Sequence, residues 1–185
     1  QWMDLYKTKD SFVLAPLVYS ITKGFDECAT MDTKTVVSAN ESLLFLDIPN
    51  LKLVPESIIK PSKDKLWPQE SLTVTYNGVE YTLKASGDKS NGERQYVDND
   101  QTELFYEVEN YSLSLQVDGQ AERKLFEVGT FENTFMQIEF IGDLDADGKL
   151  DFLFSVPRNY EEHRMLLFLS SDPKEAYESS LAFDC

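Results

Sequence analysis

The stretch Asp143-Leu144-Asp145-Ala146-Asp147-Gly148-Lys149-Leu150-Asp151 places aspartates at positions 1, 3, 5 and 9 of a short turn. Calcium is a hard cation that takes about six to eight oxygen ligands, at roughly 2.3–2.6 Å. Carboxylates at positions 1, 3 and 5 of a tight loop can converge on one such ion, and here they are Asp143, Asp145 and Asp147. Gly148 at position 6 can adopt the positive φ of a sharp turn. The spacing therefore predicts a calcium site.

The remaining ligands are expected from the second half of this loop. Position 7 supplies a backbone carbonyl in loops of this kind, which assigns that role to Lys149. Asp151 at position 9 can bind the ion directly or through water. The alternative is an acidic turn without a metal, but four carboxylates within nine residues repel one another unless a cation neutralises them.

The residues on both sides of the loop have the period of strands. Phe154 stands at position 12, where an EF-hand has a bidentate glutamate. Apolar residues alternate with their neighbours before the loop and after it: Met136, Ile138 and Phe140, then Leu150, Phe152, Phe154 and Val156. A period of two predicts a strand–loop–strand hairpin in place of a helical EF-hand.

This strand-flanked loop resembles the calcium loops of integrin-like FG-GAP and related propeller repeats, over residues 140–154. The resemblance implies side-chain ligands from four aspartates and a carbonyl ligand from Lys149. The four are Asp143, Asp145, Asp147 and Asp151.

The C-terminal region, from Gly142 onward, also resembles the end of a group of uncharacterised exported bacterial proteins. In both, the acidic loop precedes a strand ending in Phe168-Leu169-Ser170-Ser171, and a cysteine, here Cys185, closes the chain. This second resemblance implies export and a bound metal, and it implies no particular activity.

Composition and charge narrow the classes of partner. The net charge is -16, from 33 acidic and 17 basic residues, which argues against nucleic acids and anionic membrane surfaces. No run of about 18 apolar residues predicts a transmembrane helix. The chain begins at Gln1 without a starting methionine, as expected after removal of an upstream export segment. We therefore expect a secreted, periplasmic or cell-envelope protein.

The two cysteines are Cys28 and Cys185. An even number of cysteines in an exported protein favours a disulfide, so we predict that they pair. The alternative is two free buried thiols.

The clearest hairpin in the sequence covers residues 72–85 and turns at Asn77-Gly78, a pair typical of type I′ turns. In that register three cross-strand pairs fall on one apolar face: Tyr76 with Val79, Val74 with Tyr81, and Leu72 with Leu83. Threonines and Glu80 fall on the other face. This predicts a sheet that packs one face on a core.

The rest of the chain also reads as strands with turn signals between them. Residues 11–22 are apolar on both faces and predict a buried strand, and residues 172–180 suggest one short helix. With about ten strands and no 20–50-residue repeat, the fold class expected is all-β. We expect a single domain, residues 1–185, forming an antiparallel sandwich or barrel-like fold with one calcium-loop hairpin.

No catalytic signature is present. Serines are plentiful and His163 is the one histidine, but no G-x-S-x-G, P-loop, G-x-G-x-x-G or zinc spacing occurs. A second acidic cluster, 98–100, lacks the glycine and reads as a solvated turn. The sequence favours a non-enzymatic exported domain with a structural calcium that serves binding or scaffolding. The alternative is a carbohydrate-binding module or small glycan-active hydrolase, in which Trp2, Trp67 and tyrosines form a sugar platform.

Overall fold

The computed structural model describes residues 1–27, 30–98 and 101–182. Its regular structure there is all-β apart from one short 3-10 turn, η1 (Pro55–Ser57). The strands are β1 (Met3–Lys7), β2 (Phe12–Pro16), β3 (Tyr19–Asp26), β4 (Met31–Ser38), β5 (Glu41–Leu46), β6 (Ser71–Tyr76), β7 (Val79–Lys89), β8 (Glu93–Asp98), β9 (Gln101–Phe105), β10 (Val108–Val117), β11 (Arg123–Thr130), β12 (Gln137–Gly142), β13 (Asp151–Ser155), β14 (Glu162–Phe168) and β15 (Tyr177–Ala182). The all-β prediction is confirmed.

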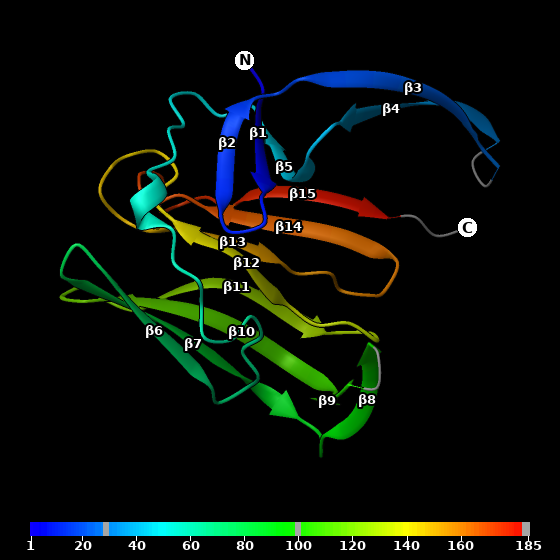
Figure 1. Ribbon diagram of the computed structural model, residues 1–185. Helices are drawn as coiled ribbons and strands as arrows, with labels where there is room; N and C mark the ends of the chain where they lie inside the picture. Colours follow the sequence, from blue (N-terminus) through cyan, green and yellow to red (C-terminus); the bar gives the residue numbers. More distant parts are fainter. Residues whose placement is uncertain (28–29, 99–100, 183–185) are drawn as a thin grey trace.

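Three sheets form the body of the molecule (Figure 1). Their strand orders are β2-β1-β5, β11-β10-β7-β6 and β12-β13-β14-β15, and every named strand pair is antiparallel. None of these orders closes on itself, so of the two forms expected, the sandwich is found and the barrel-like form is not. The two remaining sheets are two-stranded ribbons, β3-β4 and β8-β9.

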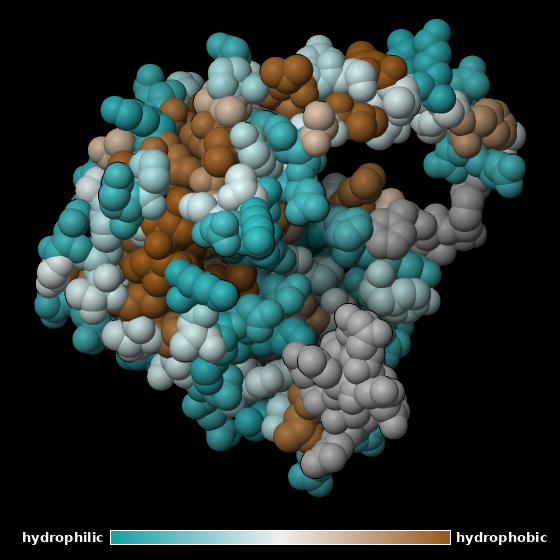
Figure 2. All heavy atoms as spheres, viewed as in Figure 1, coloured by the Kyte–Doolittle hydropathy of each residue, from teal (hydrophilic) through white to brown (hydrophobic). Residues whose placement is uncertain are grey.

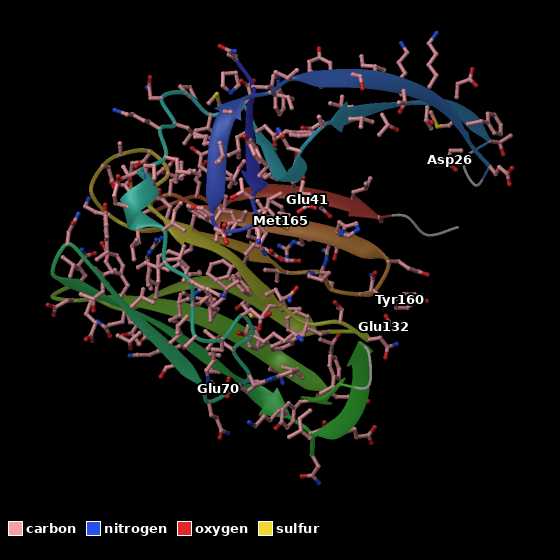
Figure 3. The ribbon with its side chains drawn as sticks, viewed as in Figure 1. Asp26, Glu41, Glu70, Glu132, Tyr160 and Met165 are labelled. Carbon is pink, nitrogen blue, oxygen red and sulfur yellow. The ribbon has the colours of Figure 1, made fainter. Side chains whose placement is uncertain are left out.

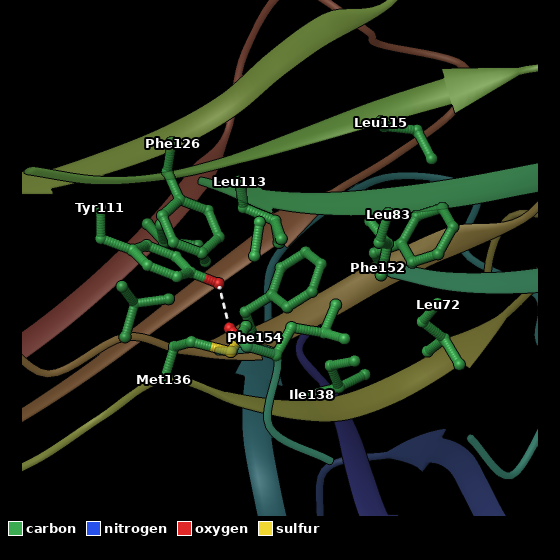
Figure 4. Packing of buried hydrophobic residues seen from close by; sticks show 14 of the residues in the cluster. Leu72, Leu83, Tyr111, Leu113, Leu115, Phe126, Met136, Ile138, Phe152 and Phe154 are labelled. Atoms are coloured by element: carbon green, nitrogen blue, oxygen red, sulfur yellow. Dashed lines mark hydrogen bonds between the residues drawn. The ribbon is translucent and has the colours of Figure 1, made fainter. Parts of the chain in front are cut away.

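The strand β13 is buried on both faces of its sheet, β12-β13-β14-β15. Phe152 and Phe154 of β13 lie in one hydrophobic cluster, which is shared with β6, β7, β10 and β11 (Figure 4). Leu153 between them lies in a second cluster, which is shared with Leu5 of β1 and Leu46 of β5. Because successive side chains of a strand point to opposite faces, the run Phe152-Leu153-Phe154 supplies both cores.

The predicted hairpin of residues 72–85 is confirmed as β6–β7. Leu72 pairs with Leu83, Val74 with Tyr81, and Tyr76 with Val79. Asn77 and Gly78 have φ values of 50° and 77°, as a type I′ turn requires. The large buried side chains of this face enter the first cluster, where the Tyr111 hydroxyl donates a hydrogen bond to the Leu66 carbonyl at 2.9 Å.

Two local predictions are wrong. Residues 11–22 are not one buried strand: β2 ends at Pro16, and β3 begins at Tyr19 with all eight of its residues exposed. Residues 172–180 form no helix, because turns lead into β15, which pairs with β14. No helix in the described ranges is long and apolar enough to cross a membrane. That residues 1–185 form a single domain stays a prediction.

Candidate metal centre

The acidic loop connects β12 to β13, two antiparallel neighbours. Gly142, the last residue of β12, pairs with Asp151, the first residue of β13. This pairing brings Asp143 and Asp151 together although they are eight positions apart. Between them the chain turns through two residues of positive φ, Ala146 at 59° and Gly148 at 84°. The glycine predicted for the sharp turn is therefore used as such.

Three of the four loop aspartates converge. Asp143, Asp145 and Asp151 each offer a carboxylate oxygen, and these oxygens all lie within 4.8 Å of one another. Two oxygens on opposite sides of an ion, each about 2.4 Å from it, would be about 4.8 Å apart. The spacing therefore fits a shared cation. Among the described residues, this is the one group of three or more His, Cys, Asp or Glu side chains that converges in this way.

Backbone N–H groups hold Asp143 and Asp151 in place. Gly148 N donates to Asp143 Oδ2 at 2.9 Å. Leu144 N and Ser170 N donate to the two oxygens of Asp151, both at 2.7 Å. The Asp143 and Asp151 side chains are almost wholly buried, at 1% and 0% exposure. These carboxylates are thus oriented before any ligand arrives, which lowers the entropy that binding must overcome.

Asp147 lies outside the converging group. Its Oδ1 accepts a hydrogen bond from Lys149 N at 2.9 Å, and its Oδ2 accepts one from the Ser170 hydroxyl at 2.9 Å. The Lys149 ammonium lies 3.7 Å from the same Oδ2. That Asp147 and the Lys149 carbonyl act as ligands stays a prediction.

Burial sets the electrostatics of the centre. Desolvation of the Asp151 carboxylate, together with the charge of Asp145, raises its pKa to about 7. The hydrogen bonds from Ser170 and Leu144 oppose this rise. An acidic group whose charged form is poorly solvated and lies beside other carboxylates is stabilised by a nearby cation.

Sequence analysis missed the residues that fasten the loop to the rest of the fold. Asp143 N donates to the Ser57 hydroxyl at 2.6 Å, and that hydroxyl donates to the Val54 carbonyl at 2.6 Å. Val54 N donates to the Asp143 carbonyl at 2.9 Å. Ser57 is 86 positions away along the chain, so no local pattern could have assigned it.

Ser170 and Ser171, noted only as part of a sequence resemblance, contact the loop directly. The Ser171 hydroxyl donates to Asp145 Oδ2, and the Ser170 hydroxyl donates to Asp147. Beside them is a depression of about 350 Å³ that gives access to the loop from solvent. Its lining residues are Ile48, Pro49, Asn50, Leu51, Asp145, Asp147, Leu169, Ser171 and Tyr177.

The other candidate residues do not assemble into a site. Trp67 stacks on Phe135 and packs against Phe105 and Tyr106, so it belongs to the first core and not to an exposed sugar platform. Trp2 is 53% exposed. His163 lies exposed on β14. Cys28, Cys185 and part of the 98–100 cluster lie outside the described residues, so the disulfide stays a prediction.

Comparison with known proteins assigns neither a family nor a function to the chain. No protein-family model, curated protein or solved structure matches the chain.

Proposed function

We propose that this chain is an exported calcium-binding domain whose calcium is structural and which serves binding or scaffolding at the cell envelope. The observation that carries the proposal is the convergence of three aspartate oxygens within 4.8 Å, on a loop with two nearly fully buried carboxylates. Such a concentration of buried negative charge is costly without a cation.

Calcium fits this donor set better than other common ions. All the side chains offered are carboxylates, which are hard oxygen donors, and no histidine or cysteine is in the group. Magnesium demands near-octahedral geometry and gives up its waters reluctantly, so a loop dense in carboxylates favours calcium. The likeness to FG-GAP loops supports the same metal, and with it the ligand roles of Asp147 and the Lys149 carbonyl.

The position of the loop favours a structural role over a catalytic one. The backbone carbonyls of Leu144 and Asp143 accept hydrogen bonds from the backbone N–H groups of residues 52 and 54. The loop's aspartate side chains accept hydrogen bonds from the hydroxyls of Ser170 and Ser171. Asn77, in the turn of the β6–β7 hairpin, contacts it from a different sheet. A cation bound here would therefore tie together segments from three regions of the chain.

The acidic composition, the two cysteines and the likeness of the C-terminal region to exported bacterial proteins support export. Extracellular calcium modules work with Kd values of about 10⁻⁴–10⁻³ M, because the ion is abundant outside cells. We expect this loop to bind calcium in that range or more tightly.

The test is thermal unfolding in millimolar calcium, in magnesium, and in a chelator. A ligand that binds only the folded state at about a hundred times its Kd stabilises it by about 2.7 kcal/mol. We expect calcium to raise the Tm by several degrees over the chelator, and magnesium to raise it less. Equal melting in calcium and chelator would refute a structural calcium.

A further inference from the structure

The ribbon formed by β3 and β4, here called the arm, extends away from the three packed sheets (Figure 1). All eight residues of β3 are exposed, and six of the eight in β4 are as well. Of the eleven large hydrophobic side chains exposed in the described residues, seven lie in or beside the arm: Val18, Tyr19, Ile21, Phe25, Met31, Val36 and Val37. Figure 2 shows several apolar residues along it. An isolated two-stranded ribbon is marginally stable in water, and a clustered apolar surface marks an interaction site.

The register gives the arm one face of distinct chemistry. Ile21 lies opposite Val36, and Lys23 lies directly opposite Lys34. The basic-apolar face, as we call it, comprises Tyr19, Ile21, Lys23, Phe25, Lys34 and Val36. Asp32, opposite Phe25, is the acid on this face. Like charges directly opposite each other destabilise an antiparallel pair, so the two lysines favour an acidic partner.

The base of the arm is fixed to the body. The buried carboxylate of Asp4 accepts hydrogen bonds from the Ser38 hydroxyl at 2.8 Å and the Asn40 side-chain amide at 3.0 Å. Ser38 is the last residue of β4, so the direction of the arm is set where it leaves the fold. A pre-organised arm loses less entropy when it binds.

An acidic hollow of about 600 Å³ lies near the β8–β9 ribbon and the ends of β10 and β11. The acidic groove, as we call it, is lined by Glu93, Glu107, Glu109 and Glu132 beside Phe105 and Phe131. No lysine or arginine is among the described residues that line it. Its charge and its aromatic residues complement those of the basic-apolar face.

We propose that the arm of one copy of this chain lies in the acidic groove of a second copy, reciprocally, in a two-fold dimer. In Figure 3, Asp26 at the outer end of the arm and Glu132 of the groove lie on the same side of the molecule, one high and one low. Reciprocal contacts of this kind are related by a two-fold axis, so the assembly closes.

The area of such an exchange lies at the lower limit for a specific interface. A strand of eight residues is about 26 Å long, and a two-stranded ribbon is about 10 Å wide. Two arms that each contact the partner copy along their full length, in the groove and on the surface beside it, bury about 1,000 Å² as flat area, which is where specific interfaces begin. The occupant is thus a second copy, which supplies both complementary surfaces itself.

The first experiment measures the mass of the full chain in solution by sedimentation velocity, from about 1 to 100 µM and at low and high salt. We expect a dimer that weakens as salt rises, because the lysine–glutamate contacts are screened. Lys23→Glu with Lys34→Glu should weaken dimerisation at least about tenfold. The control Lys9→Glu with Lys174→Glu reverses the charge of two exposed lysines outside the arm. It should leave the dimerisation affinity unchanged. A wild-type chain that is monomeric throughout would overturn the proposal.

The second experiment exchanges the charges. Alone, the groove variant Glu107→Lys with Glu132→Lys should dimerise at least about tenfold more weakly than the wild type, as should the arm variant. Mixed together, they should form a heterodimer, because arm glutamates then meet groove lysines while the other arm and groove keep their native charges. Both substituted pairs are exposed, and far-ultraviolet circular dichroism checks that each variant is folded. Two folded variants that fail to associate when mixed would show that the arm does not bind the groove.

Discussion

The side-chain amide of Asn77 donates a hydrogen bond to the carbonyl of Gly148 at 3.1 Å, across 71 positions of the chain. Asn77 begins the turn between β6 and β7, and Gly148 is the turn glycine of the acidic loop. The backbone of Leu150, two residues further on, hydrogen-bonds the Tyr81 hydroxyl of β7. The sheet β11-β10-β7-β6 thus holds the acidic loop of the sheet β12-β13-β14-β15 in place.

Asn77→Gly tests that contact. Glycine keeps the positive φ of the turn but removes the donor, so the hairpin should form while the Gly148 carbonyl loses its partner. We expect the free energy of unfolding to fall by about 0.5–1.5 kcal/mol, in urea melts with calcium present. Asn133→Gly is a matched control, because Asn133 is also exposed and also has a positive φ, of 51°. Equal losses in the two variants would mean that the contact with Gly148 contributes nothing specific.

The buried hydroxyl of Tyr111 gives a second prediction. It donates to the Leu66 carbonyl at 2.9 Å, and Tyr111 is 1% exposed (Figure 4). Tyr111→Phe keeps the ring packing but leaves that carbonyl unpaired in the core, which should cost about 1–3 kcal/mol in a denaturant melt. A loss below about 0.3 kcal/mol would indicate that another donor reaches the Leu66 carbonyl.

Glu162 gives a pH dependence. The Arg158 guanidinium and backbone N–H, with the Ser180 hydroxyl, lower the pKa of this buried carboxyl to about 2. Because the unfolded value is about 4.3, the native state favours the charged form, and the stability gained is present above pH 4.3. It is lost as the pH falls toward 2. Glu162→Gln should therefore be less stable than wild type at pH 6 and approach it near pH 2. A stability difference that does not change with pH would contradict this role.

The predicted disulfide between Cys28 and Cys185 can be tested chemically. It would close a loop of about 157 residues, which in the chain-entropy model stabilises the folded state by about 4–5 kcal/mol. Thiol titration of the freshly isolated, unfolded and unreduced protein should detect no free thiol. Detection of two thiols per chain would show that the cysteines do not pair.

Short sequence patterns predicted the elements that depend only on residues close together in the sequence. The Asn77-Gly78 turn and its alternating flanks specify their own register, so the β6–β7 hairpin was predictable residue by residue. The acidic loop was predictable for the same reason, because Asp143, Asp145 and Asp151 need only the turn between them to converge.

The remaining features depend on contacts between distant segments. The apolar pattern of residues 11–22 fits a buried strand and an exposed one equally well. The sequence therefore could not show that β3 extends from the packed sheets as an arm. β15 forms because β14 offers an edge, which outweighs the weak helical tendency of residues 172–180. Ser57 reaches the loop from η1, in the connection between β5 and β6, and only the assembled fold brings it there.

The central claim is that the carboxylates of this loop bind calcium. Isothermal titration calorimetry of the full chain with calcium tests it most directly, for the wild type, for Asp145→Ala and for Asp118→Ala, which removes an exposed carboxylate from the β10–β11 turn. Asp145→Ala loses one of the three converging oxygens, so its affinity should fall at least about tenfold. We predict one site per chain with a Kd of about 1 mM or tighter in the wild type and in Asp118→Ala. No heat of binding at millimolar calcium, or an unchanged Kd in Asp145→Ala, would contradict the account.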